Sequence, residues 1–202
     1  VTEGELLIDG VNVKDLSQKD LRDIIGFVPQ KGMLFSGTIE SNIKYSDDNM
    51  SDEQMKSAAQ IAQATEFIDT KPETYNSPIA QGGSNVSGGQ KQRISLARAL
   101  ARKAPVLILD DSTSALDMET ERDIRNGLLQ MKDVSKIIIA HRISSVCKAD
   151  EIIVLDNGKI AERGTHKELL EREGLYYSTY EAQYGDYRKA LKVIGEEELI
   201  CQ

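Results

Sequence analysis

One stretch of the sequence combines small residues and hydrogen-bonding side chains in a pattern that suits a phosphate group. It reads QGGSNVSGGQKQR over residues 81–93. Ser87 can cap a helix whose first turn is Gly88, Gly89 and Gln90, and free N–H groups at a helix start can bind a phosphate. The spacing Ser87-x-x-Gln90 is also that of a capping box. The paired glycines count against a capping box alone, because each costs about 0.5–1 kcal/mol inside a helix. We therefore expect another group to approach the backbone closely here.

A second stretch places two carboxylates after a run of apolar residues. It reads VLILDD over residues 106–111, which predicts a buried strand ending at Asp110 and Asp111. Open α/β sheets bind their ligands at the carboxyl ends of strands. There, one carboxylate can hold Mg²⁺ while the other orients an attacking water. Taken alone the pattern is weak, because an apolar strand followed by Asp also occurs at helix caps and turns.

The order of several motifs along the chain is more specific than any one of them. The sequence VPQ at residues 28–30 precedes both stretches, and SALD at 114–117 and IIIAHR at 137–142 follow them. This order resembles the ATP-binding-cassette (ABC) ATPases. In that family the motifs are, along the chain, the Q-loop, the signature motif, the Walker B strand, the D-loop and the switch histidine. The resemblance extends over about residues 1–175.

Other segments are similar to the exporters within that family. They are LFSGTIxxNI at 34–43, the pair His141-Arg142, ADEIIVL at 149–155 and ERGTH at 162–166. The resemblance implies that the domain works with the transmembrane domain of an exporter and with a second nucleotide-binding domain. It also implies a place at the cytoplasmic face of the cell membrane.

The resemblance implies a role for each matching residue, with ATP and Mg²⁺ as cofactors. Among the expected catalytic residues, Gln30 contacts Mg²⁺ or the lytic water, Asp111 contacts the water and His141 contacts the γ-phosphate. Asp110 joins Gln30 at the metal. The residues expected to bind ATP held by the opposing domain, or to lie at that interface, are Ser87, Gly88, Gly89, Gln90 and Asp117. Without the motif order, His141 would be better interpreted as a buried, hydrogen-bonded histidine.

Two departures from the family pattern stand out. First, no G-x-x-x-x-G-K-[ST] loop occurs anywhere in the sequence, so no lysine of that motif can reach the β- and γ-phosphates. We expect that the chain starts downstream of this Walker A loop and is inactive alone; the alternative is a pseudo-ATPase that never had it. Second, Asp111 stands where the family usually has Glu, and Val86 where it usually has Leu. The alternative function is therefore a degenerate or non-hydrolytic regulatory subunit whose signature motif completes a partner's active site.

The elements that position these motifs predict an α/β fold of the P-loop NTPase-like ABC type. We expect a mostly parallel sheet, strand-like runs at 25–28, 106–110, 136–140 and 152–155, and a helical subdomain at about 38–102 between the Q-loop and Walker B. The pair Asp9-Gly10 predicts a hairpin, and Ser17 and Ser51 predict helix starts. We expect an ATPase domain over 1–175 and a helical extension with a tail over 176–202. The tyrosines at 176, 180, 184 and 187 share one helix face, which favours packing over partner docking.

Composition excludes several other classes of protein. The 202 residues carry 25 basic and 33 acidic side chains, a formal net charge of -8. This balance argues against a nucleic-acid partner, whose phosphates require a basic face. A DNA-repair ATPase of the same family would need a long coiled-coil insertion, and none is present. No apolar run approaches the ~20 residues of a membrane-spanning helix.

Overall fold

The computed structural model describes residues 2–47 and 49–194, with side chains described through residue 185. Contacts divide the chain into two units, Val1–Ile139 and Ala140–Gln202, and each is described by itself. The sequence-based division at 175/176 stays a prediction, and residues 195–202 of its expected tail lie outside the described residues.

A tight hairpin and a short helix open the first unit. Strands β1 (Leu7–Ile8) and β2 (Val11–Asn12) pair antiparallel around Asp9 and Gly10. Both turn residues have positive φ, 49° and 79°, as a two-residue hairpin turn of the right twist requires. Helix α1 (Gln18–Asp23) follows, and the Ser17 side chain caps it by accepting from the Asp20 amide. The predicted hairpin and helix start are confirmed.

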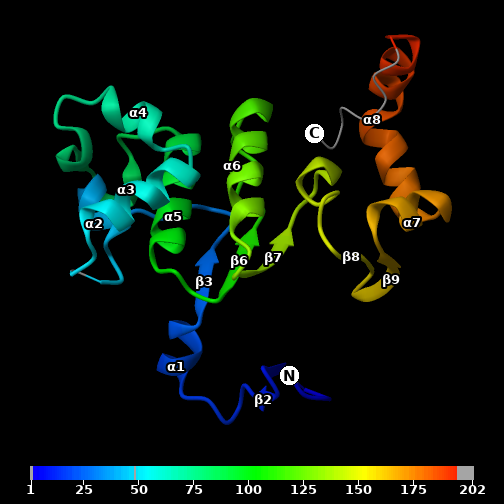
Figure 1. The fold of residues 1–202 in the computed structure, drawn as a ribbon, viewed down its shortest axis with the longest axis horizontal. Helices are drawn as coiled ribbons and strands as arrows, with labels where there is room; N and C mark the ends of the chain where they lie inside the picture. Colours follow the sequence, from blue (N-terminus) through cyan, green and yellow to red (C-terminus); the bar gives the residue numbers. More distant parts are fainter. Residues whose placement is uncertain (1, 48, 195–202) are drawn as a thin grey trace. The chain divides into compact units, whose positions relative to one another are not determined.

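The site rests on a parallel sheet of three strands. In Figure 1, β6 (Val106–Asp110) lies between β3 (Ile25–Val28) and β7 (Ser135–Ile139). One face is buried beneath helix α5 (Gly88–Ala101). Gly26 permits this approach, since a Cβ there would lie 3.2 Å from the Ala99 carbonyl oxygen. The opposite face leaves Phe27, Ile137 and Ile139 about half exposed.

The predicted helical region lies between β3 and β6 in the sequence. It contains α2 (Ile39–Ile43), α3 (Asp52–Ile61), α4 (Thr65–Asp69) and α5, with β4 (Gly37–Thr38) paired antiparallel to β5 (Pro78–Ile79). Short 3₁₀ turns occupy Thr74–Asn76 and Gln81–Gly83. Fully buried side chains join these helices into one core; they include Ile39, Ile43, Met55, Ile68, Ile94 and Leu96. Helix α6 (Met118–Gln130) adds Ile124 and Leu128 to it.

The second unit combines an antiparallel pair of strands with two helices. Strand β8 (Ile152–Asp156) pairs with β9 (Lys159–Gly164), and α7 (His166–Glu171) and α8 (Leu175–Ile194) follow. The predicted run at 152–155 is therefore a strand, but it belongs to this antiparallel pair and not to the parallel sheet. A 3₁₀ turn spans Ile143–Ser145. Tyr176 and Tyr180 are buried, and the Tyr184 hydroxyl accepts a hydrogen bond from the Ser144 amide. The tyrosine face is thus a packing face for these three residues, and the Tyr187 side chain lies outside the described ones. No helix in the described part of the chain is both long and apolar enough to span a bilayer.

Candidate functional site

The carboxyl ends of two neighbouring strands bring the Q-loop to the Walker B residues. Gln30 lies two residues beyond β3, and Asp111 directly follows β6. Because these strands are parallel neighbours, their ends meet at one edge of the sheet. The Gln30 Nε2 atom donates to Asp111 Oδ2 across 3.2 Å. The structure therefore joins two predicted catalytic residues that are 81 positions apart in the sequence.

Asp111 has an unusual backbone conformation for a residue with a side chain. Its φ is 45°, in the left-handed region, which Asp and Asn tolerate better than most residues. The conformation is held because the Asp111 amide donates to the Ile139 carbonyl at 2.8 Å. Asp110, the predicted metal residue, is half-buried and faces Ile139 of β7 as the last pair of the ladder.

These oxygen donors fit a magnesium ion that binds mostly to nucleotide and water. Mg²⁺ commonly takes one or two carboxylates plus substrate phosphates rather than a full protein cage. Asp110 can supply the carboxylate, and the Gln30 side chain can supply an amide oxygen. Among the described residues no group of three or more His, Cys, Asp or Glu could hold a metal ion by itself. One carboxylate and one amide oxygen match the small protein share of a Mg²⁺ site whose other ligands are phosphate and water.

The helix start at Ser87 has the two features predicted from the sequence, a capping box and a close approach to the glycine backbone. Ser87 and Gln90 form a reciprocal capping box, each side chain accepting from the other's amide at 3.2 Å. Ser87 and Gly88 are exposed and accessible to a ligand. Gly89 is approached from within the chain, because a Cβ there would lie 3.3 Å from the Ala115 oxygen. The close approach predicted from the glycines is thus made at Gly89 by the D-loop, and the phosphate role of Ser87, Gly88, Gly89 and Gln90 stays a prediction.

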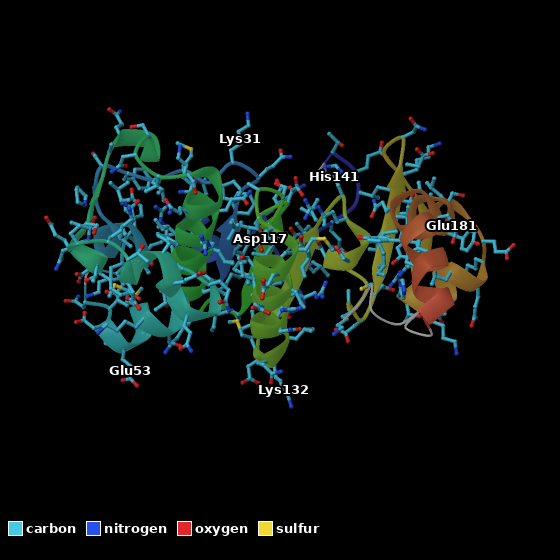
Figure 2. The ribbon with its side chains drawn as sticks, turned by 90° about the horizontal axis from the view of Figure 1, so that it is seen from above. Lys31, Glu53, Asp117, Lys132, His141 and Glu181 are labelled. Atoms are coloured by element: carbon cyan, nitrogen blue, oxygen red, sulfur yellow. The ribbon has the colours of Figure 1, made fainter. Side chains whose placement is uncertain are left out.

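Asp117 caps a helix in addition to its predicted place at an interface. Its carboxylate accepts from the Thr120 amide at 2.9 Å and from the Thr120 hydroxyl at 2.8 Å, at the start of α6. These hydrogen bonds, the backbone one first, lower the pKa of the Asp117 carboxyl. The Asp117 side chain is nevertheless exposed (Figure 2).

His141 belongs to the second unit, where its side chain is exposed. Its backbone is fixed because its carbonyl accepts from Gln183 Nε2 at 2.7 Å (His141 is labelled in Figure 2). The alternative of a buried histidine is therefore wrong. Contact between His141 and a γ-phosphate stays a prediction.

Sequence reasoning missed two polar residues of α5. Gln92 is 5% exposed and contacts both the Q-loop and the D-loop. Arg98 donates to the backbone oxygens of Met33 and Asn42. The available signal was a polar side chain on the otherwise apolar stripe of a helix, whose buried position requires hydrogen-bond partners.

Comparisons with known proteins assign the family. The family model described as ABC transporter matches residues 1–114. The ATP-dependent lipid A-core flippases of Haemophilus influenzae and Photobacterium profundum are 47% identical over 186 residues and 46% over 188. These matches cover 91% and 92% of this chain and 32% of each relative, so the chain spans about a third of their length.

A solved structure agrees with this assignment. It is a bacterial Atm1-family ABC exporter with ATP bound, similar with a TM-score of 0.87 and 41% identity, over 90% of this chain and 32% of that one. The α/β fold with its parallel sheet and helical region is therefore the one expected from the motifs. The chain belongs to the ABC transporter family, as a nucleotide-binding domain of the exporter type.

Proposed function

We propose that this chain is the part of an ABC exporter that binds and hydrolyses ATP, coupling dimerisation and hydrolysis to export. The observation that carries the proposal is the hydrogen bond from Gln30 to Asp111, at the carboxyl ends of β3 and β6. Open α/β sheets place their reactive ligands at this edge.

Each side chain at the edge has a task that its chemistry allows. When bound, ATP would supply the phosphoanhydride that water cleaves to release phosphate, and a Mg²⁺ ion held by Asp110 and Gln30 would neutralise charge on the phosphates. Asp111 can accept a hydrogen bond from a water and orient it, since a carboxylate is an acceptor on both oxygens. Gln30 donates to that same carboxylate and so fixes its orientation. The Asp110 carboxylate would bind the Mg²⁺ ion.

The test is ATP hydrolysis by the complete exporter subunit that carries this sequence. Asp111→Asn should lower kcat by about 100-fold or more, because the water loses an oriented carboxylate. Asp133→Asn is the matched control, since Asp133 is exposed and lies away from the site, and it should stay within about twofold. Unchanged turnover in Asp111→Asn would refute the catalytic assignment. Because the sequence holds no Walker A loop, we expect the isolated chain to hydrolyse no ATP.

We further propose that the domain works with a transmembrane domain and a second nucleotide-binding domain at the cytoplasmic membrane face. Relatives named as flippases support this. The exposed positions of Ser87, Gly88 and Asp117 support a facing domain at this surface. ATP-dependent dimerisation of the complete subunit, measured by light scattering, should be lost in Ser87→Arg, whose side chain would block the helix start. Dimerisation of that variant at the wild-type ATP concentration would contradict the arrangement.

A second candidate function is a degenerate subunit that binds ATP and hydrolyses it slowly. The shorter side chain of Asp111, already engaged by Gln30 at 3.2 Å, favours it. Losing one methylene removes about 1.5 Å of reach, and a 1 Å misplacement can cost about 100-fold in rate. Asp111→Glu in the complete subunit should then raise kcat at least tenfold, although Glu tolerates the positive φ less well. An equal or lower rate would argue for ordinary hydrolysis with Asp.

A further inference from the structure

One buried amide touches both loops of the candidate site. Gln92 Nε2 lies 3.5 Å from the Gln30 carbonyl oxygen and 3.4 Å from Ser114 Oγ. Its Oε1 accepts from the Ala115 amide at 3.1 Å. The residue lies on α5, one turn beyond the exposed helix start at Ser87 and Gly88.

These contacts close a ring around Asp111. Ser114 Oγ donates to the Asp111 carbonyl at 2.9 Å, and Gln30 Nε2 donates to the Asp111 carboxylate at 3.2 Å. Asp111 is therefore held at its backbone from the D-loop side and at its side chain from the Q-loop side. Gln92 contacts both of the residues that bind Asp111, Ser114 and Gln30.

The Q-loop backbone also packs closely against α5 at Gly32. A Cβ on Gly32 would lie 2.8 Å from Ser95 Oγ and 3.1 Å from the Lys91 carbonyl oxygen. The loop backbone is thus seated against the same helix turn that carries Gln92. Displacement of this loop must either break the Gln92 contact or carry α5 with it.

We propose that Gln92 is a positioning residue that fixes the Q-loop and the D-loop to α5 and thereby sets the carboxylate of Asp111. This rests on the proposed ATPase function and extends it. Gln92 thereby joins the helix start that α5 offers to the facing domain to both the Q-loop and the D-loop of the same chain. A methionine of similar size would leave the Ala115 amide and the Gln30 carbonyl without this partner.

The test uses the complete exporter subunit with Gln92→Met and Ser114→Ala, singly and together. Each single change should lower kcat about tenfold and leave the KM for ATP within about threefold, because the site binds nucleotide but holds Asp111 loosely. Together they should lower kcat by far less than 100-fold, since both act through Asp111. Additive losses, or an unchanged kcat in Gln92→Met, would overturn the proposal. Gln60→Met, on an exposed position of α3, is the matched control and should change neither constant.

Amide hydrogen exchange separates this inference from the proposed function, because it needs no ATPase activity. Gln92→Met should speed exchange both at residues 30–33 and at 114–117, whereas Gln60→Met should change neither. Gln92→Glu keeps an acceptor for the Ala115 amide and loses the donor that faces the Gln30 carbonyl and Ser114 Oγ, so exchange should rise at 30–33 while the Ala115 amide stays protected. It also serves if the methionine variant does not fold. Unchanged exchange in both loops would refute the positioning role even in an active transporter, and an inactive wild type would refute only the proposed function.

Discussion

Asp117 is a residue whose predicted role and observed role are different in kind. The motif order places it at an interface with a second domain, whereas the structure shows it capping α6 through two hydrogen bonds from Thr120. The two roles are compatible, because the capping carboxylate remains exposed. Substitutions at 117 will therefore affect the stability of the first unit as well as any interface.

The cap gives Asp117 a pH dependence with a definite sign. Its folded pKa is lowered from the ordinary 3.8, so its stabilisation is fully present above that value. The stabilisation is lost as the pH falls through the folded pKa. At pH 7, Asp117→Ala should lower the Tm, and Asp117→Asn should lower it less, because Asn also caps helices well. Thermal unfolding at pH 7 and below pH 3 measures both differences.

The low-pH measurement contains the control for this prediction. The difference between wild type and Asp117→Asn should shrink on acidification, since both side chains are then neutral. A difference that grows at low pH would contradict the assignment. Asp133→Ala, at an exposed loop position, should leave the Tm unchanged at either pH.

At the scale of elements, Arg98 ties α5 to the segment that follows the Q-loop. Its guanidinium donates to Asn42 O at 2.7 Å, Asn42 Oδ1 at 2.7 Å and Met33 O at 2.9 Å. It also lies over the rings of Phe35 and Tyr45, which stack on each other at 4.3 Å. Asn42 is buried and uses its own amide to hold the carbonyls of Phe35 and Thr38.

Replacing this guanidinium with an ammonium should destabilise the first unit. A lysine cannot reproduce the planar fork, so Arg98→Lys cannot keep all three hydrogen bonds, although Asn42 Oδ1 retains the one from the Phe35 amide. We expect a loss of about 2–3 kcal/mol in the free energy of unfolding, measured with urea. Arg122→Lys, on the exposed face of α6, should change it by less than about 0.5 kcal/mol. Equal losses in the two variants would show that the fork contributes nothing.

A second element, α8, is capped from a distant strand. The Glu162 carboxylate in β9 accepts from the amides of Leu175 and Tyr176 at 2.8 and 2.9 Å. A Cβ on Gly174 would overlap Glu162 Oε1. Gly174→Ala should therefore displace the carboxylate and destabilise the second unit by about 1–3 kcal/mol in urea unfolding.

A double-mutant cycle tests the cause of that loss. In a Glu162→Ala background the overlap is gone, so Gly174→Ala should cost little more. If the same loss persists without the Glu162 carboxylate, the clash is not its origin.

Local patterns predicted most elements, because their causes lie within a few residues. Ser17 and Ser51 cap the helices expected of them, and the runs at 25–28 and 106–110 are strands with those bounds. At Ser51 the capping box is only half formed, since the Gln54 side chain donates instead to Ala101 O. A partner 47 positions away outcompetes the local one, and periodicity carries no information about it.

In the candidate site, too, local sequence motifs could be predicted and contacts between distant segments could not. Motif order identified Gln30 and Asp111, and parallel strand ends explain why they meet. The ring through Gln92 could not be predicted, because it depends on how closely the Q-loop and the D-loop approach one helix turn. Gly89 shows this again: the paired glycines predict a close approach to the backbone, but only the structure identifies the Ala115 oxygen as one group that makes it.

At the scale of the whole molecule, each unit leaves an apolar strand surface exposed. In the first, Phe27, Ile137 and Ile139 are 54%, 52% and 49% exposed on one face of the parallel sheet. In the second, Leu155 and Ile160 are cross-strand partners in β8 and β9, at 70% and 62% exposed. Parallel sheets are almost always covered on both faces, so the surface of the first unit requires a cover.

We therefore expect the isolated 202-residue chain to bind a hydrophobic dye such as ANS and to self-associate. An exposed apolar patch of this kind drives association in water. Ile137→Thr with Ile139→Thr should lower both dye fluorescence and the apparent mass in light scattering, because threonine keeps the β-branched shape and adds a hydroxyl. Ser135→Thr, on the same strand but already polar, is the matched control and should change neither. In the complete exporter subunit we expect the rest of the protein to cover residues 137 and 139, so the double substitution should instead lower the free energy of unfolding. A monomeric, non-fluorescent wild-type chain would show that this face is already shielded within the 202 residues.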